Sequence, residues 1–414
     1  TNGGTYDLNG DGVNTKFNNE EHLANQYWSW GFTASGWQAH GIYDFNGDGD
    51  KGDTQTFTTS YFAFDITNPE VAPTLLWEFT DPDLGFTTSY PGIVHVDHLN
   101  SDWWVAFGSG PTDYDGSSTQ VGKTYVIKAK NGTQPNNSPV GTNWGVNSAM
   151  ADVISVDYDI NASQCAGDPQ VCTYSPDAYY IGDTQGTMWR ISCVGGNWAG
   201  TQTALVNLGN TKPITAAPSA SQDDMGRMWI YFGTGQFYHE NDKSNADAQS
   251  IVGVKEPIDW FDADADGDDD ELTIYHNACM SAQTVPVGNL LNVTDYSVFE
   301  GDYVDIDDDG AFVVGTDMTF TELVTEIEQH PADPDVPKHY DGFILDLYTP
   351  GGGDPSERCI AKPTILGGIT TFTTFLPNDS ACAFEGESFL YALYYKTGTS
   401  YIDPIVGYTG DTIT

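Results

Sequence analysis

Short apolar segments bounded by Gly, Asn, Asp and Pro recur along the chain, and this pattern is typical of β-strands. The clearest of them lie at residues 58–65, 75–79, 103–107, 123–127, 187–191 and 227–232. One theme, a strand with a central aromatic residue followed by a turn, repeats at residues 61–67, 125–132, 188–192 and 390–398. Such repetition indicates a β-propeller, because each four-stranded blade must bury its faces against its neighbours. We therefore predict an all-β fold and, within that class, a β-propeller.

Helical patterning is confined to one segment. Residues 322–328 are predicted to form a helix, with Thr321 as its N-terminal cap. Residues 331–340 and 349–356 are rich in Pro, Asp and Gly and are predicted to be loops. No run of about 18 apolar residues occurs, so we expect no membrane insertion.

The charge of the chain is strongly one-sided. It carries 59 Asp and Glu against 14 Lys and Arg, for a formal net charge of −45 at pH 7. This field repels phosphate backbones and anionic head groups, which excludes nucleic acid as a partner. Of the acidic residues, 45 are Asp and 14 are Glu. Because Asp favours turns and supplies oxygen ligands for hard cations, the excess points to loops and to metal.

Six cysteines, at positions 165, 172, 193, 279, 359 and 382, fit about three disulfides and an oxidising, extracellular compartment. Cys165–Cys172 and Cys359–Cys382 are the preferred local pairs, and the pairing of Cys193 and Cys279 is left open. No CxxC spacing occurs, so neither a zinc ribbon nor a covalently attached haem is supported.

The sharpest chemical signal is a loop pattern, Asp-x-Asp/Asn-x-Asp-Gly, that occurs four times. Alternate carboxylates can fold onto one cation when Gly at the sixth position permits a sharp turn. Calcium is the cofactor that this pattern predicts, with several ions per chain. The candidate ligands are Asp7, Asn9 and Asp11; Asp44, Asn46, Asp48, Asp50 and Asp53; Asp262, Asp264, Asp266 and Asp268; and Asp305, Asp307 and Asp309.

These loops differ from EF-hands, which close with a bidentate Glu at the twelfth position. That position holds Asn18, Gln55, Thr273 and Thr316, so later ligands such as Asp53, Asp270 or Asp317 are needed. The alternative is a set of solvated acidic turns without metal. No catalytic centre stands out: the chain has no HExxH, GxSxG or P-loop motif, and we expect no enzyme.

Several segments together resemble the C-terminal propeller domain of PilY-type proteins, the type IV pilus biogenesis factors and tip adhesins. The most specific is Arg358-Cys-Ile-Ala-Lys-Pro-Thr-Ile-Leu-Gly-Gly368. The others keep the family's order at residues 63–69, 75–85, 105–110, 180–190, 213–218, 231–235, 249–253, 372–377 and 388–398. The resemblance covers roughly residues 55–400.

The resemblance implies a modified seven-bladed propeller, exported to the cell surface and placed at the pilus tip. There it would support pilus extension against retraction and help adhesion, with pilins or minor pilins and surface glycans as partners. The family usually carries a calcium loop before the segment that begins at Tyr180. The matching positions here are Asp157, Asp159, Asn161 and Asp177, interrupted by an insertion that contains two cysteines.

On this interpretation residues 1–414 form a single PilY-type domain, in which residues 1–54 are a calcium-loop segment and residues 240–350 a loop-rich insertion. Two alternatives are kept. One is an acidic structural or glycan-binding propeller unrelated to pili, because fold does not fix function. The other is a quinoprotein-like oxidoreductase, since similar turns occur in quinone-binding propellers.

Overall fold

The structure is a computed structural model. It describes residues 5–6, 15–16, 29–33, 36–40, 54–57, 59–95, 103–134, 145–156, 178–192, 202–224, 227–257, 260–261, 271–272, 284–307, 310, 313, 316–328, 340–378, 386–405, 408–409 and 412–413. Within these residues the elements are strands, apart from one α-helix, α2 (Phe320–Glu328), and the short 3-10 helices η1 (Glu240–Ser244), η2 (Val287–Asn289) and η3 (Gly351–Gly353). The predicted all-β class is confirmed.

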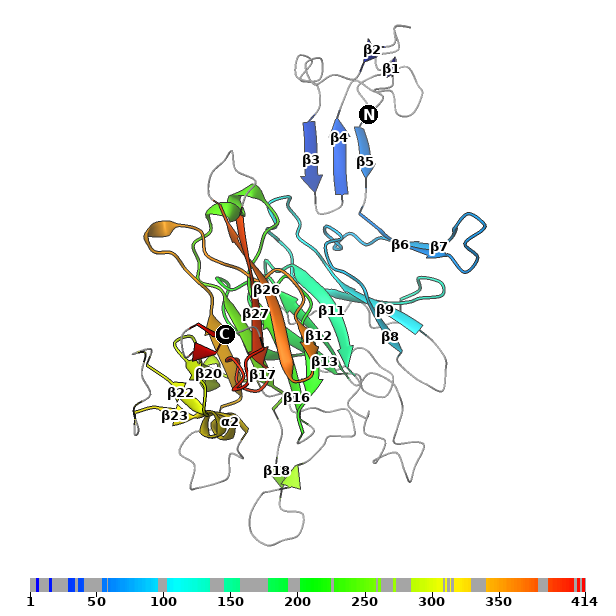
Figure 1. The fold of residues 1–414 in the computed structure, drawn as a ribbon. Helices are drawn as coiled ribbons and strands as arrows, with labels where there is room; N and C mark the ends of the chain where they lie inside the picture. The colour runs from blue at the N-terminus through cyan, green and yellow to red at the C-terminus, as the bar shows by residue number, and fades with distance from the viewer. Residues whose placement is uncertain are drawn as a thin grey trace, which may run out of the picture.

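Two large sheets form the middle of the molecule (Figure 1). The first is a four-stranded antiparallel sheet in chain order, β11 (Met150–Val156), β12 (Ala178–Asp183), β13 (Thr187–Ser192) and β14 (Gln202–Asn207). The second has the order β15 (Ser219–Gln222), β16 (Met228–Gly233), β17 (Ser250–Lys255), β24 (Gly342–Asp346) and β20 (Leu290–Asn292). Among the described strand pairs, β20 with β24 is parallel and the others are antiparallel.

Smaller sheets complete the described part of the chain. Three-stranded sheets are β8 (Gly92–His95), β9 (Trp103–Gly108) and β10 (Thr124–Lys128); β25 (Thr364–Leu366), β26 (Ile369–Pro377) and β27 (Gly386–Tyr394); and β3 (Ser29–Thr33), β4 (Gly36–His40) and β5 (Thr54–Phe57). Two-stranded sheets are β1 (Thr5–Tyr6) with β2 (Thr15–Lys16), β6 (Tyr61–Asp65) with β7 (Thr74–Phe79), and β18 (Trp260–Phe261) with β19 (Glu271–Leu272). A last sheet has the order β23 (Met318–Thr319), β22 (Tyr303–Asp305), β21 (Ser297–Phe299), β29 (Thr412–Ile413) and β28 (Tyr408–Thr409). Figure 1 shows β3–β5 set apart from the main body.

The central strands are buried on both faces. All six residues of β12, of β16 and of β17 are buried, which explains their continuous runs of aromatic and β-branched residues. The largest core cluster joins Trp229, Tyr231 and Phe343 of the second sheet to the apolar face of α2. The strands predicted from the sequence are therefore present as β6, β7, β9, β10, β13 and β16.

The helix begins earlier than the sequence predicts. Thr319, rather than Thr321, is the cap: its Oγ1 accepts a hydrogen bond from Glu322 N at 3.1 Å. Glu322 Oε2 in return accepts bonds from Thr319 N (2.7 Å) and Oγ1 (2.9 Å), which makes a reciprocal capping box. These bonds hold the pKa of Glu322 below its usual value, with the backbone bond the larger cause. The Thr321 cap is therefore wrong, because Thr321 lies in the first turn of α2.

Two hairpins contain the same contact between a buried Asp and a Trp, which the sequence analysis missed. Asp183 Oδ2 accepts a hydrogen bond from Trp189 Nε1 at 2.8 Å, and Asp223 Oδ2 accepts one from Trp229 Nε1 at 3.0 Å. In each hairpin Oδ1 accepts the backbone N–H four residues on, at 2.9 Å. The sequence spacing Asp-x5-Trp identifies this turn. The carboxylate stabilises the hairpin because it accepts hydrogen bonds from the N–H groups of the turn.

Cys359 is a free, fully buried thiol, so the predicted Cys359–Cys382 disulfide is wrong. Its Sγ lies 3.6 Å from both Ala361 O and Thr373 O, inside the core cluster. Burial raises the pKa of this thiol to about 11, so it stays protonated and packs as a small apolar group. The other five cysteines, and the pairs predicted for them, lie outside the described residues.

Candidate metal centre

One of the four predicted acidic loops lies largely within the described chain, between β22 and β23. Tyr303 pairs with Thr319 and Val304 with Met318, so the antiparallel register places the next residues, Asp305 and Asp317, opposite each other. Asp307 follows two residues into the loop. The hairpin thus places Asp305, the first residue of the Asp-x-Asp pattern, next to Asp317, which lies outside that pattern.

The carboxylates of Asp305, Asp307 and Asp317 converge. One oxygen from each lies within 4.8 Å of the others. Asp305 is fully buried, Asp317 is half-buried and Asp307 is exposed, so the cluster opens to solvent on one side. Asp317, which the sequence analysis named only as one option for a later ligand, completes the group.

Backbone N–H groups orient the two inner carboxylates. Asp305 Oδ1 accepts from Asp307 N (3.1 Å) and Oδ2 from Gly310 N (2.8 Å), where Gly310 has a φ of 79°. Asp317 Oδ1 accepts from Ile306 N (3.2 Å) and Oδ2 from Val313 N (2.5 Å). The positive φ explains the Gly at the sixth position of the pattern, because other residues adopt this conformation at a cost.

This donor set fits a hard cation. Each carboxylate offers about four lone-pair directions, so one N–H bond per oxygen leaves acceptor capacity for a metal. Carboxylate oxygens are the ligands that calcium prefers, and its flexible coordination suits a loop of irregular geometry better than the strict octahedron of magnesium. Asp305, Asp307 and Asp317 would therefore hold calcium, with water and backbone carbonyls as further ligands.

The remaining predicted ligands lie outside the described residues and stay predictions. They are Asp7, Asn9, Asp11, Asp44, Asn46, Asp48, Asp50, Asp53, Asp157, Asp159, Asn161, Asp177, Asp262, Asp264, Asp266, Asp268 and Asp309.

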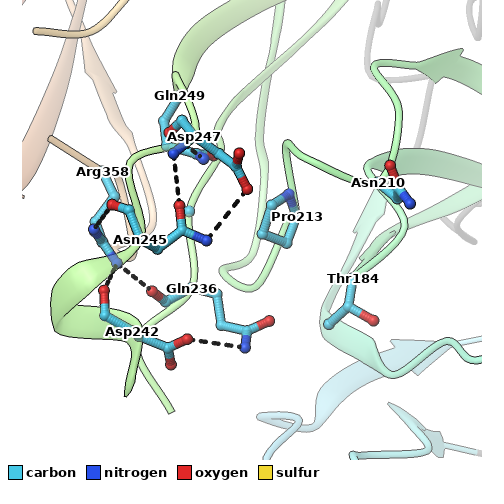
Figure 2. Close-up of a pocket in the computed structure, with 10 residues that line it drawn as sticks. Thr184, Asn210, Pro213, Gln236, Asp242, Asn245, Asp247, Gln249 and Arg358 are labelled. Atoms are coloured by element: carbon cyan, nitrogen blue, oxygen red, sulfur yellow. Dashed lines mark hydrogen bonds between the residues drawn. The ribbon is translucent and has the colours of Figure 1, made fainter. Parts of the chain in front are cut away.

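A second polar site is a cavity of about 110 Å³ where several loops meet (Figure 2). Thr184 follows β12, Asn210 and Pro213 precede β15, and residues 236–249 connect β16 to β17. Figure 2 shows Arg358 on one side of this cavity, beside Asp242 and Asn245, with Thr184 and Asn210 across from it.

Arg358 is a structural clamp in this cavity rather than an anion-binding residue. Its Nη1 donates to Gln236 O (3.1 Å) and Asp242 O (2.6 Å), and its Nη2 donates to Asn245 O (3.1 Å) and Ser356 O (3.0 Å). Nε donates to Ser356 O at 3.3 Å, so these carbonyls take up the five N–H groups of the guanidinium. Arg358 is 2% exposed, and this burial lowers its pKa. The most specific resembling segment thus begins with a residue that fixes a loop.

A buried ion pair ties β13 to the end of β17. Arg190 contacts the Glu256 carboxylate, which also accepts a hydrogen bond from the Tyr180 hydroxyl. Burial raises the pKa of Glu256, and the adjacent guanidinium opposes that shift. Both side chains are almost fully enclosed, at 1% and 4% exposure, so no substrate reaches them. The pair is structural.

Comparison with solved structures identifies the fold. The fold is that of the PilY1 C-terminal domain: a crystal structure of that domain from Pseudomonas aeruginosa matches 95% of this chain and 87% of its own, with a TM-score of 0.54 and 18% identity. No family model matches the sequence.

Sequence relatives are of the same kind. A type IV pilus biogenesis factor PilY1 homolog of Xylella fastidiosa is 26% identical over 366 residues, which span 82% of this chain and 21% of the relative. PilY1 of P. aeruginosa PAO1 is 23% identical over 372 residues, spanning 81% of this chain and 28% of the relative. The resemblance inferred from the sequence is confirmed. The chain spans less than a third of these curated relatives, whose names describe pilus biogenesis factors rather than enzymes.

Among the described residues, no helix has the length and apolar character needed to span a bilayer.

Proposed function

We propose that this chain is a non-enzymatic, calcium-stabilised domain of a type IV pilus biogenesis factor, exposed at the cell surface at the tip of a pilus. The observation that carries the pilus role is the agreement between the ordered sequence segments, the relatives and the matched fold. In this role the domain supports pilus extension against retraction, contacts pilins or minor pilins, and contributes to adhesion.

The same proposal includes a modified propeller of seven blades. Three features support it. Strands β11–β14 follow one another in an antiparallel sheet, which is the order of a propeller blade. The Asp–Trp turn recurs in successive sheets, as a repeated unit requires. The central strands are buried on both faces, as expected for sheets packed between neighbours.

Calcium supplies the stabilising charge in this proposal. The cluster of Asp305, Asp307 and Asp317 supports it, because three converging carboxylates repel one another unless a cation or protons neutralise them. The other acidic loops repeat the same sequence pattern, so several ions are expected per chain.

The pilus role is tested in cells of the source organism. The gene is deleted, and the strain is complemented with either the intact gene or one that lacks the region encoding this chain. We expect surface pili and twitching to be lost on deletion and restored by the intact gene alone. Electron microscopy with an antibody to the chain should label filament ends. Normal pili and twitching in the deletion strain would contradict the pilus role and favour an acidic surface protein of another kind.

A further inference from the structure

A second cavity, separate from the acidic loop and from Arg358, has a different lining. It measures about 350 Å³, a size within the range of small-molecule sites, and is lined by Phe86, Thr87, Thr88, Pro111, Asp113, Tyr114, Gly116 and Tyr238. Three segments build it: the chain after β7, the loop between β9 and β10, and the chain after β16.

Hydrogen bonds within and between these segments hold the walls of the cavity. Phe86 N donates to Pro111 O at 2.8 Å, which joins the first segment to the second. Thr112 N and Asp113 N both donate to Ser117 O, at 3.0 and 3.1 Å, and fix the turn that carries Tyr114. Tyr238 N donates to Asp242 Oδ2 at 2.7 Å, which fixes the third segment. A cavity held in this way is pre-formed, so a ligand would not have to order it.

Gly116 allows the Tyr238 ring to pack closely against the turn that carries Tyr114. A Cβ at this position would lie 2.5 Å from Tyr238 Cδ2, and the residue has a φ of 86°. The Tyr238 ring therefore lies directly against the turn of Tyr114, and any larger residue at 116 would displace it.

The cavity presents an exposed aromatic ring, that of Tyr114, together with polar side chains. Tyr114 is 61% exposed, and its ring meets His239 edge-on, with centroids 5.0 Å apart. Thr87 and Thr88 also line the cavity and are exposed, the Thr88 side chain is hydrogen-bonded to Tyr238, and Asp113 is half-buried. This combination suits a ligand that has an apolar C–H face and a rim of hydroxyl groups.

We propose that this cavity binds a neutral pyranose ring, such as a terminal sugar of a glycan, with Tyr114 as the stacking platform. The slightly positive C–H hydrogens of a sugar face are attracted by the negative face of the aromatic ring. The hydroxyl groups donate to the Asp113 carboxylate and exchange hydrogen bonds with the threonine hydroxyls. No Lys or Arg lines the cavity, and the chain carries a net charge of −45, so acidic sugars are repelled.

This proposal names a ligand class for the adhesive part of the proposed function and rests on that function for its biological setting. The two fail separately, because sugar binding is measured on the isolated chain and pilus formation on cells.

The test uses the 414-residue chain and a set of methyl glycosides. Methyl glucoside, galactoside, mannoside and N-acetylglucosaminide are the neutral probes, methyl glucuronide is the acidic one, and binding is followed by saturation-transfer NMR and calorimetry. We expect at least one neutral glycoside to bind. Tyr114→Ala should weaken that binding by at least tenfold, and Tyr114→Trp should retain it, since both change only an exposed side chain.

The matched control is Tyr348→Ala. Tyr348 is 60% exposed, almost as much as Tyr114, and does not line this cavity. Its replacement should leave sugar affinity unchanged, and thermal melts of all variants should match the parent. Gly116→Ala should also weaken binding, because it displaces Tyr238. Absence of binding to every neutral probe, equal affinity in the Tyr114→Ala and Tyr348→Ala variants, or preference for the glucuronide would overturn the proposal.

Discussion

Replacing the exposed carboxylate of the acidic loop, Asp307, tests whether this residue binds a metal ion or only supports the structure of the hairpin. Asp307 is exposed, whereas Asp305 is buried and its oxygens accept backbone N–H groups within the loop. Asp307→Ala therefore deletes the exposed member of the three converging carboxylates and leaves the buried Asp305 in place. We expect this variant to lose calcium-dependent stability while its calcium-free stability is unchanged or slightly raised.

The size of the effect follows from charge and from ligand linkage. Two carboxylate oxygens within 4.8 Å, such as those of Asp305 and Asp317, repel by at least about 3 kcal/mol at an effective dielectric near 20. A cation present at 100 times its Kd adds about 2.7 kcal/mol to the free energy of unfolding. With an unfolding entropy of about 2.1 cal/mol/K per residue, this corresponds to a rise of about 3 °C in Tm for 414 residues.

The assay is calorimetric melting of parent and variants in chelator and in saturating calcium. Other acidic loops can contribute to the calcium response of the parent, so the measured quantity is the difference between parent and variant. Asp307→Ala should reduce the calcium-induced gain by about 3 °C. Asp307→Asn should keep most of it, because Asn retains a ligand oxygen and occupies the same place in the loops at Asn9 and Asn46.

Asp403→Ala is the control, since Asp403 is exposed and lies outside the acidic loop. It removes the same charge without removing a ligand. An equal calcium-induced gain in the parent and in Asp307→Ala would show that Asp307 is not a calcium ligand. A fall in Tm of the same size in chelator and in calcium would also contradict the prediction, because that result identifies Asp307 as structural.

Three further outcomes test the described core. Cys359→Ala should lower by one the number of thiols titrated per chain in denaturant without reductant, whereas a disulfide at this position would release a thiol instead. The pKa of the Cys359 thiol is about 11 in the folded protein, above the reference value of 9.0. The protonated thiol therefore contributes stability that is fully present below pH 9 and is lost as the pH rises through 11. Thermal melts of Cys359→Ala should show a smaller loss of stability than the parent over that pH range. Arg190→Met should cost about 3–5 kcal/mol in urea unfolding, because it leaves the Glu256 carboxylate buried and unpaired, and a cost below about 1 kcal/mol would contradict a structural pair. Thr319→Ala should cost about 1 kcal/mol in the same assay and Thr321→Ala less, and the reverse order would restore Thr321 as the cap.

The strands could be predicted from the sequence because their signal is local. Each is a short run of aromatic and β-branched residues, and central strands such as β16 are buried along their whole length. The helix was also predicted, but its start was placed two residues late. The local pattern does distinguish the two candidates: Glu322 lies three residues after Thr319, as a capping box requires, whereas Val324 lies three residues after Thr321.

The candidate metal centre was only partly predictable. Asp305 and Asp307 follow from the spacing of the pattern, because positions one and three of such a loop are adjacent in any compact turn. Asp317 depends on the register between β22 and β23, which brings together residues twelve positions apart in the chain. Cys359 was mispredicted for a related reason: an even number of cysteines does not show which of them a core encloses.

We expect calcium binding at the acidic loop to affect the stability of the whole domain, because of where the loop lies in the fold. β22, which ends at Asp305, pairs with β23, and Thr319 of β23 caps α2. Val304 of β22 and Leu323 of α2 belong to the same core cluster as Trp229 and Phe343. A cation bound by the β22–β23 hairpin would therefore also hold the start of the helix and its apolar face against the second large sheet. Calcium removal is for this reason expected to shift the main unfolding transition instead of adding a separate transition for the loop.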